Sequence, residues 1–244
     1  MPSLLRDSIT LDDVLARPDV WRGDRLASTS TPALPSGFAA LDAELPGGGW
    51  PRGGLSEILC DRAGIGELSI IVPALRQLHR QQRTTLLVAP PLALYAPGWF
   101  AAGVDPAHLI VVAPHTVRDA LWAVEQALAS GALGAVLYWN AQIGAAQVRR
   151  LEVAVSGSDT LAWLLRPLRA QNEASACALR LRLATGPRGS IAVDLLKRRG
   201  TPCARTLNLD IARPLPRNRT DEPTLARRPF AVLAARSARN AIAA

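Results

Sequence analysis

The sequence is poor in several residue types, and each shortage excludes a class of protein. It contains only three histidines and three cysteines, Cys60, Cys177 and Cys203, which lie far apart without CxxC spacing. We therefore expect neither a disulfide framework nor a bound metal, and a reducing cytoplasm suits these thiols. No stretch approaches the ~18–20 uninterrupted apolar residues of a membrane span. Residues 1–19 carry acids and lack the apolar core of a signal peptide, so we expect neither export nor membrane contact.

Lysine is nearly absent as well, since Lys197 stands against 27 arginines. The net charge of +8 is unevenly distributed: residues 1–196 hold 17 arginines and 17 acidic residues, whereas residues 197–244 hold 11 basic residues and three acidic ones. A basic end on a neutral body indicates contact with nucleic acid or with an acidic protein. A solvated, disordered tail explains the same charge equally well.

The chain divides into four predicted parts. Residues 1–25 contain a short amphipathic helix, 26–36 are a linker, 37–209 are a folded core, and 210–244 are a basic segment rich in Pro and Arg that we expect to be disordered alone. The helix cannot bury its apolar stripe by itself, so it docks either on its own core or on a partner. Its apolar positions are Leu4, Leu5, Ile9, Leu11, Val14 and Leu15. Trp21, in the polar stretch that follows, is a candidate interface anchor.

The pattern of the core is that of an α/β protein. Continuous apolar runs alternate with helical patterns, which predicts a mostly parallel sheet covered by helices on both faces. The predicted strands are 55–60, 83–91, 108–114, 133–139 and 160–167, and the main helices are 67–83, 116–131 and 145–159. Period-two alternation on both sides of GPRG, residues 186–189, predicts an antiparallel hairpin at one sheet edge. We expect Trp50, Trp99, Trp122, Trp139 and Trp163 in the core or at its rim.

The stretch DRAGIGELS, residues 61–69, has the order of a phosphate-binding loop. It follows an apolar strand and precedes a helical pattern, so backbone N–H groups can cradle phosphates. Such a loop also needs a lysine and a Ser or Thr directly after its last glycine, and Glu67 and Leu68 stand there instead. A glycine turn in an unrelated α/β protein is the alternative. The candidate loop residues are Asp61, Arg62, Gly64, Gly66, Glu67 and Leu68.

Longer stretches carry a family resemblance. LPSGFAALDAELPGGGWPRGGLSEILC is similar to the start of a RecA-type recombinase core, and the similarity of pattern extends over roughly residues 35–200. The phrases RPDVWRGD, EILCDRAGIGEL, LRPLRAQNEAS and DLLKRRG more closely resemble the ImuA family, the RecA-like proteins associated with translesion DNA synthesis in bacterial mutagenesis cassettes. The resemblance implies a RecA-like, P-loop-type core.

Carried over position by position, the parts of an ATPase are missing. Glu67 and Leu68 replace the phosphate-binding lysine and the Mg²⁺-binding hydroxyl, Pro91 replaces the water-orienting glutamate, and Trp139 replaces the metal-supporting aspartate. A carboxylate at position 67 faces phosphates with the wrong sign. We therefore expect a pseudo-ATPase that is not an enzyme and uses no cofactor. Weak binding of an anion by the amides near Gly64 and Gly66 stays open.

The resemblance also implies two DNA-binding loops, after the strands that end at Trp139 and Arg166. Here the first is nearly absent and PLRAQNEASA is a short substitute for the second. Nearby arginines either contact phosphates or form an ordinary solvated edge. The full set of candidates for partner or DNA contact is Trp21, Arg149, Arg150, Arg166, Arg169, Lys197, Arg198, Arg199, Arg213, Arg217, Arg219, Arg227, Arg228, Arg236 and Arg239.

The resemblance implies an accessory role in SOS-induced, error-prone translesion synthesis. Its implied partners are ImuB, a polymerase-like hub, an error-prone DNA polymerase, and RecA, with DNA and self-association left open and a cytoplasmic, damage-dependent nucleoid location. The alternatives are a SulA-like inhibitor of cell division, against which the length and the basic tail argue, and a plain DNA-binding module. A true recombinase ATPase is disfavoured by the missing residues.

Overall fold

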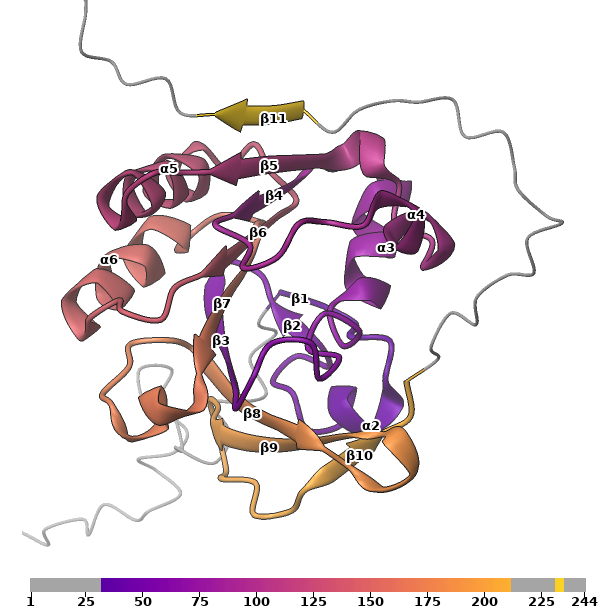
Figure 1. Ribbon diagram of the computed structural model, residues 1–244. Coiled ribbons are helices and arrows are strands. Elements are labelled where there is room, and N and C mark those ends of the chain that lie inside the picture. The colour runs from indigo at the N-terminus through magenta and orange to yellow at the C-terminus, as the bar shows by residue number, and fades with distance from the viewer. Residues whose placement is uncertain (1–31, 212–230, 235–244) are drawn as a thin grey trace, which may run out of the picture.

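The computed structural model describes residues 32–211 and 231–234, which build one nine-stranded sheet flanked by helices (Figure 1). The strand order across it is β10-β9-β8-β3-β7-β6-β4-β5-β11. Its strands are β3 (Gly54–Cys60), β4 (Thr85–Val88), β5 (Leu109–Ala113), β6 (Ala135–Trp139), β7 (Leu161–Pro167), β8 (Leu179–Thr185), β9 (Ile191–Lys197), β10 (Leu207–Leu209) and β11 (Ala231–Ala234). A separate antiparallel pair joins β1 (Ala33–Leu34) to β2 (Trp50–Pro51).

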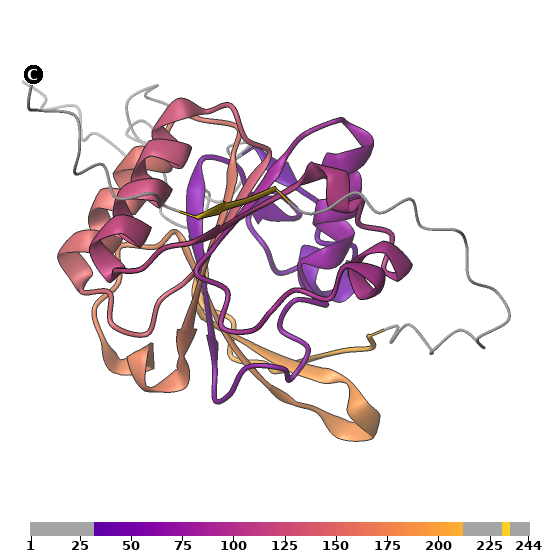
Figure 2. The same cartoon turned by 45° about the horizontal axis from the view of Figure 1, so that its top comes forward.

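The helices lie on both faces of the sheet, as Figure 2 shows. They are α2 (Ala39–Asp42), α3 (Val72–Arg80), α4 (Ala96–Ala101), α5 (Val117–Ser130) and α6 (Ala145–Val155), with the 3₁₀ turns η2 (Pro106–His108), η3 (Leu168–Asn172) and η4 (Pro187–Gly189). One apolar core packs the sheet against α2, α3 and α4, and a second packs it against α5 and α6. None of the helices within residues 32–211 is long and apolar enough to cross a bilayer.

The predicted fold class is confirmed. β3, β4, β5, β6 and β7 run parallel to their neighbours, β8 runs parallel to β3, and apolar residues fill both faces of the central strands. The predicted hairpin is also present, because β9 pairs antiparallel with β8. It is not the edge of the sheet, however, since β10 pairs antiparallel with β9 beyond it.

Two chain segments differ from the predicted division into parts. Residues 33–34, assigned above to the linker, form β1, and Leu34 is buried in the core. Within the segment expected to be disordered alone, Ala231–Ala234 pairs in parallel with β5 and so covers that edge of the main sheet. The predicted N-terminal helix, Trp21, and most of the basic tail lie outside the described residues.

The tryptophan predictions hold for four residues and fail for one. Trp50 and Trp163 are fully buried and meet edge to face, with ring centroids 5.5 Å apart, while Trp99 is buried beside α3. Trp139 is half-buried against the same core. Trp122 is 64% exposed on α5, so its placement in the core was wrong. The buried face of α5 is formed by Ala120, Val124 and Leu128, one-third of a turn or more away from it.

Candidate functional site: a phosphate-type loop filled by its own carboxylate

The loop that follows β3 lies at the carboxyl ends of the parallel strands. A pocket of about 320 Å³ opens there, lined by this loop and by residues at the ends of β4, β6 and β7. Crevices at this edge are where α/β proteins place their ligands. Glu67, Pro91, Trp139 and Arg166 all line this pocket. The fold therefore brings together the three regions that the sequence assigned to a nucleotide site.

The carboxylate of Glu67 turns back onto its own loop. The backbone N–H of Gly64 donates to Oε1 and Oε2, each at 3.0 Å, and the N–H of Gly66 donates to Oε2 at 3.2 Å. Both glycines have positive φ, +86° and +106°, a conformation that aims successive N–H groups to one side and that side chains disfavour. Glu67 is only 6% exposed, and no cation of the described chain pairs with it. Its carboxylate thus accepts the hydrogen bonds that a bound anion would accept.

The helix after the loop begins later than predicted. The sequence pattern placed it at 67–83, but α3 starts at Val72, and turns occupy residues 67–71. Its first residue follows Ile71, which offers no side-chain cap, and Pro73 stands in the first turn. The positive end of the helix dipole acts only within about one turn. A helix that starts five residues beyond Glu67 therefore does not direct its free N–H groups at the loop.

The position of the expected hydroxyl is apolar and points inward. Leu68 is half-buried and packs against the core that lies under α3. Next to the loop, a Cβ at Gly66 would approach Ile191 of β9 to 3.0 Å and Ile211 to 3.6 Å. The loop consequently rests on apolar side chains from the far end of the sheet, which holds it against the core.

The strand ends on the other side of the pocket also lack polar groups that are free to act. Ala89 follows β4 in a left-handed conformation, φ 52°, and turns the chain so that Pro91 lines the pocket. Trp139 is the last residue of β6. The side-chain amide of the next residue, Asn140, donates to the Tyr138 hydroxyl and accepts from the N–H of Gln142. In the part of the chain that is described, no group of three or more His, Cys, Asp or Glu side chains is arranged to hold a metal ion.

Arg166 was expected at a solvated face and is instead buried in the core. Its guanidinium binds Glu57 Oε1 at 2.8 Å and Glu173 Oε2 at 2.6 Å, and it donates to the carbonyl of Ile143 at 2.9 Å. Burial lowers the pKa of Arg166, but the bonds to Glu57 and Glu173 outweigh it and raise the pKa above its usual value. The prediction that Arg166 contacts DNA or a partner was therefore wrong.

The sequence analysis did not identify Glu57, the ion-pair partner that explains the burial of Arg166. Glu57 is fully buried in β3, and it lies opposite Arg180 of β8, whose Nε donates to its second oxygen. For two of them the signal was present, because Glu57 and Arg166 are the single charged residues of β3 and β7. Matching Glu57 with Arg166 and Arg180 required the strand order, which places β7 and β8 on either side of β3.

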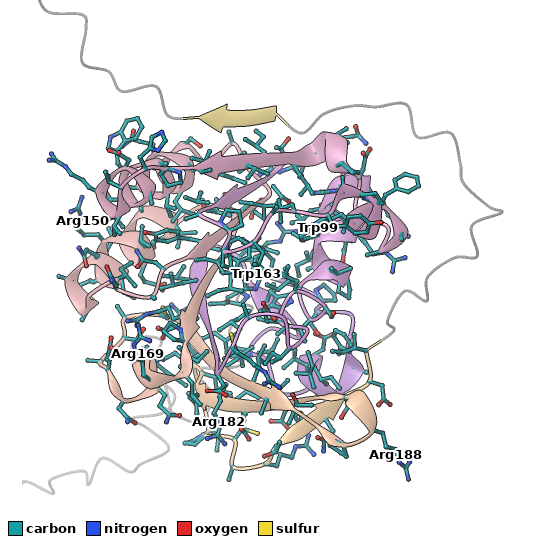
Figure 3. All side chains as sticks on the ribbon, viewed as in Figure 1. Trp99, Arg150, Trp163, Arg169, Arg182 and Arg188 are labelled. Carbon is teal, nitrogen blue, oxygen red and sulfur yellow. The ribbon has the colours of Figure 1, made fainter. Side chains whose placement is uncertain are left out.

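The other cationic candidates do not gather at one place. Arg149 and Arg150 lie on α6, where Arg150 binds Glu125 at 2.7 Å, and Arg169 of η3 is exposed and donates to the carbonyl of Ala141. Lys197, at the end of β9, donates to the Ser175 carbonyl. Arg198 binds Glu44 at 2.8 Å, while Arg199 is exposed. Figure 3 shows Arg150 and Arg169 projecting on one side, far from Arg188 at the hairpin. The candidates Arg213, Arg217, Arg219, Arg227, Arg228, Arg236 and Arg239 lie outside the described residues.

About half of the chain is similar to known RecA proteins. Over 118 residues it is 30% identical to the protein RecA of Lactobacillus delbrueckii subsp. bulgaricus, which is 48% of this chain and 35% of that protein. Over 115 residues it is 32% identical to the protein RecA of Francisella tularensis subsp. novicida, which is 47% of this chain and 32% of that protein. No family model matches the chain. The chain spans about a third of the length of the curated relatives it matches, and over that part it is RecA-like.

Proposed function

We propose that this chain is a RecA-like accessory protein that has no ATPase activity and acts as an adaptor in DNA repair. More specifically, it serves SOS-induced, error-prone translesion synthesis, linking a polymerase-like hub of the ImuB kind and an error-prone polymerase to RecA or to DNA. The similarity to RecA supports the repair context, and the ImuA-like phrases of the sequence support the narrower role.

The bonding of Glu67 is the observation that carries the non-catalytic part. A phosphate entering the loop would have to displace a carboxylate that already accepts from Gly64 and Gly66. It would also meet repulsion, because two negative charges in a partly desolvated loop raise each other's energy. No lysine is available to offset this repulsion, since the sequence contains only Lys197, at the far end of β9.

The rest of the pocket supports the same conclusion. Phosphoryl transfer requires a group that orients the attacking water and a carboxylate that supports Mg²⁺. The corresponding strand ends present Pro91 and Trp139, and the adjacent Asn140 is already hydrogen-bonded. A scaffold without catalysis can still act by binding, which is the role that the proposal gives it.

Calorimetry with Mg²⁺·ATP tests the non-catalytic part. We expect neither binding nor hydrolysis above the buffer rate, under conditions in which a RecA protein shows both. Glu67→Lys with Leu68→Thr, which restores the loop's cation and hydroxyl, serves as the matched variant. Binding by the natural chain with a Kd below about 1 mM, the upper end of ordinary enzyme KM values, would overturn this part of the proposal.

Affinity purification from DNA-damaged cells tests the adaptor role. The full chain is compared with one that ends after Ile211, because an earlier end would remove β10 from the sheet. We expect the full chain to recover polymerase subunits and RecA in a nuclease-resistant manner, and the shortened chain to lose at least one of them. Recovery of a division protein, or only of nuclease-sensitive material, would favour the SulA-like or the DNA-binding alternative.

A further inference from the structure

The outer surface of the α5–α6 pair carries two large exposed apolar side chains, Trp122 and Val153, among polar and charged ones. A hollow of about 520 Å³ lies between the two helices, lined by Glu125, Gln126 and Ala129 of α5 and by Ala146, Arg149 and Val153 of α6 among others. Val153 is 67% exposed. Trp122, 64% exposed, lies one turn before Gln126 on the same side of α5. We call this surface the α5–α6 groove.

One positive charge in this groove, that of Arg149, is left without a partner among residues 32–211, whereas that of Arg150 is paired. Arg150 is paired with Glu125 at 2.7 Å, so these two side chains largely neutralise each other. Arg149 is exposed and has no carboxylate partner among residues 32–211. An exposed tryptophan and valine beside an unpaired cation form a surface that suits an apolar helix face flanked by acids.

The sequence of the chain predicts such a helix face. Residues 4–15, LLRDSITLDDVL, combine apolar positions at helical spacing with Asp7, Asp12 and Asp13, against the single base Arg6. An amphipathic segment of this length is marginal in water unless its apolar stripe is covered. It therefore needs a partner surface of opposite charge, and the α5–α6 groove offers one.

The place where the described chain begins makes this contact reachable. The carbonyl of Pro32 accepts from the N–H of Arg52, and the Arg52 guanidinium donates to the carbonyl of Asp159, four residues after the end of α6. The N-terminal segment thus leaves the core beside the end of α6. Residues 16–31 can span up to about 50 Å when extended, whereas α6 itself is only about 16 Å long.

From the groove, its charge and this tether, we infer that residues 4–15 dock as an amphipathic helix into the α5–α6 groove of the same chain. Their leucines cover Trp122 and Val153, and Asp12 or Asp13 pairs with Arg149. The contact removes these two exposed apolar side chains from water. It does not depend on which partners the adaptor binds.

Thiol crosslinking in the full chain tests this inference. Leu11→Cys and Val153→Cys are combined in a Cys203→Ser background, because Cys60 and Cys177 are buried and do not compete. A short bismaleimide then reports on proximity, and digestion with mass spectrometry identifies the product. The matched control adds Leu4→Asp and Leu15→Asp, which leaves the tether unchanged and breaks the apolar stripe.

We expect an intramolecular crosslink that forms about tenfold faster than in the control, because the buried leucines supply most of the binding. Arg149→Glu should slow it about two- to threefold, and Asp12→Arg with Asp13→Arg should restore the rate in that variant. Equal rates in the test chain and its control would overturn the inference. A crosslink that joins two differently labelled copies would also overturn it, since the occupant would then be a second chain.

Discussion

Two buried glutamates, ten residues apart in the sequence, have their carboxylates stabilised by different kinds of group. Glu57, inside β3, is fully buried and binds the guanidinium groups of Arg166 and Arg180. Glu67, in the loop after β3, is almost as buried but binds only the backbone N–H groups of Gly64 and Gly66. A charge in the core is stable only with opposite charges in place, whereas a loop of aligned amides near solvent accepts any suitably shaped anion.

The comparison predicts its largest effect at Glu57. Glu57→Gln keeps the side-chain shape but leaves two buried guanidinium groups without their shared carboxylate, so we expect the free energy of unfolding to fall by about 3–5 kcal/mol. Urea unfolding followed by circular dichroism measures this change. A loss below about 1 kcal/mol would mean that the arginines find other partners and that the two glutamates are equally easy to replace.

His79 is a third buried ionisable side chain, and unlike the two glutamates it is buried in its neutral form. His79 of α3 is 5% exposed, and its Nε2 lies 3.0 Å from the Thr85 hydroxyl. Burial, aided by nearby His108, lowers the pKa of His79 to about 4 from 6.5. Because the folded pKa lies below the unfolded one, this contribution to stability is complete above pH 6.5 and is lost as the pH falls towards 4.

We therefore expect the protein to lose about 2 kcal/mol of stability between pH 7 and pH 5 through this histidine. Unfolding of the natural chain and of His79→Gln at both values measures the difference, since the variant cannot take up the proton. Parallel pH dependence in the two chains would show that His79 is not the group responsible.

Glu67 should be less costly to remove than Glu57. In Glu67→Ala the N–H groups of Gly64 and Gly66 lose their acceptor, but Gly64 is exposed and water replaces the carboxylate there. We expect a loss of about 1 kcal/mol, the ordinary net value of such hydrogen bonds. Added inorganic phosphate should recover part of it in this variant and none in the natural chain, where the site is already filled.

Thermal unfolding in chloride and in phosphate at equal ionic strength measures this recovery. Glu67→Gln is the control, because its amide oxygen can still accept from the loop without offering a free anion site. Equal phosphate effects in all three chains would contradict an anion site formed by these amides.

The smallest effect is expected on the surface of the sheet. Arg182 of β8 binds Asp194 of β9 at 2.7 Å, but the arginine side chain is 43% exposed. Arg182→Gln should lower stability by less than about 1 kcal/mol, because solvent screens exposed pairs. The same unfolding assay used for Glu57→Gln measures it. A loss as large as that of Glu57→Gln would mean that burial is not what separates the two ion pairs.

Much of this architecture was predictable because it depends on local patterns. The five apolar runs became β3 to β7, the GPRG turn joins β8 to β9, and Gly131 ends α5 in the left-handed conformation that favours glycine. The late start of α3 was not predictable in the same way. Turns at 67–71 replace the first helical residues because the loop closes on Glu67 and Leu68 packs inward.

At the candidate site, too, some features could be predicted from the sequence and others could not. The identities of Glu67, Leu68, Pro91 and Trp139 could be judged from the sequence, since each stands at a position defined by the neighbouring strand. That the Glu67 carboxylate would fold back onto Gly64 and Gly66 depends on the conformation of the loop. Arg166 was misjudged because its partner Glu57 lies 109 residues away in sequence and the accepting carbonyl of Ile143 lies 23 residues away, so only the folded chain brings them to it.

The sequence by itself determined the α/β class, the order of the strands and helices along the chain, and the identities of the residues at the candidate site, Glu67, Leu68, Pro91 and Trp139. These follow from residue identity and from spacing within a few turns of chain. Only the tertiary structure decided which charges are buried together, where α3 begins, that β10 and β11 lie at the two edges of the sheet, and that Trp122 lies outside the core. The reason is physical: burial and electrostatic pairing depend on which strands become neighbours, and that order arises only when the whole chain packs.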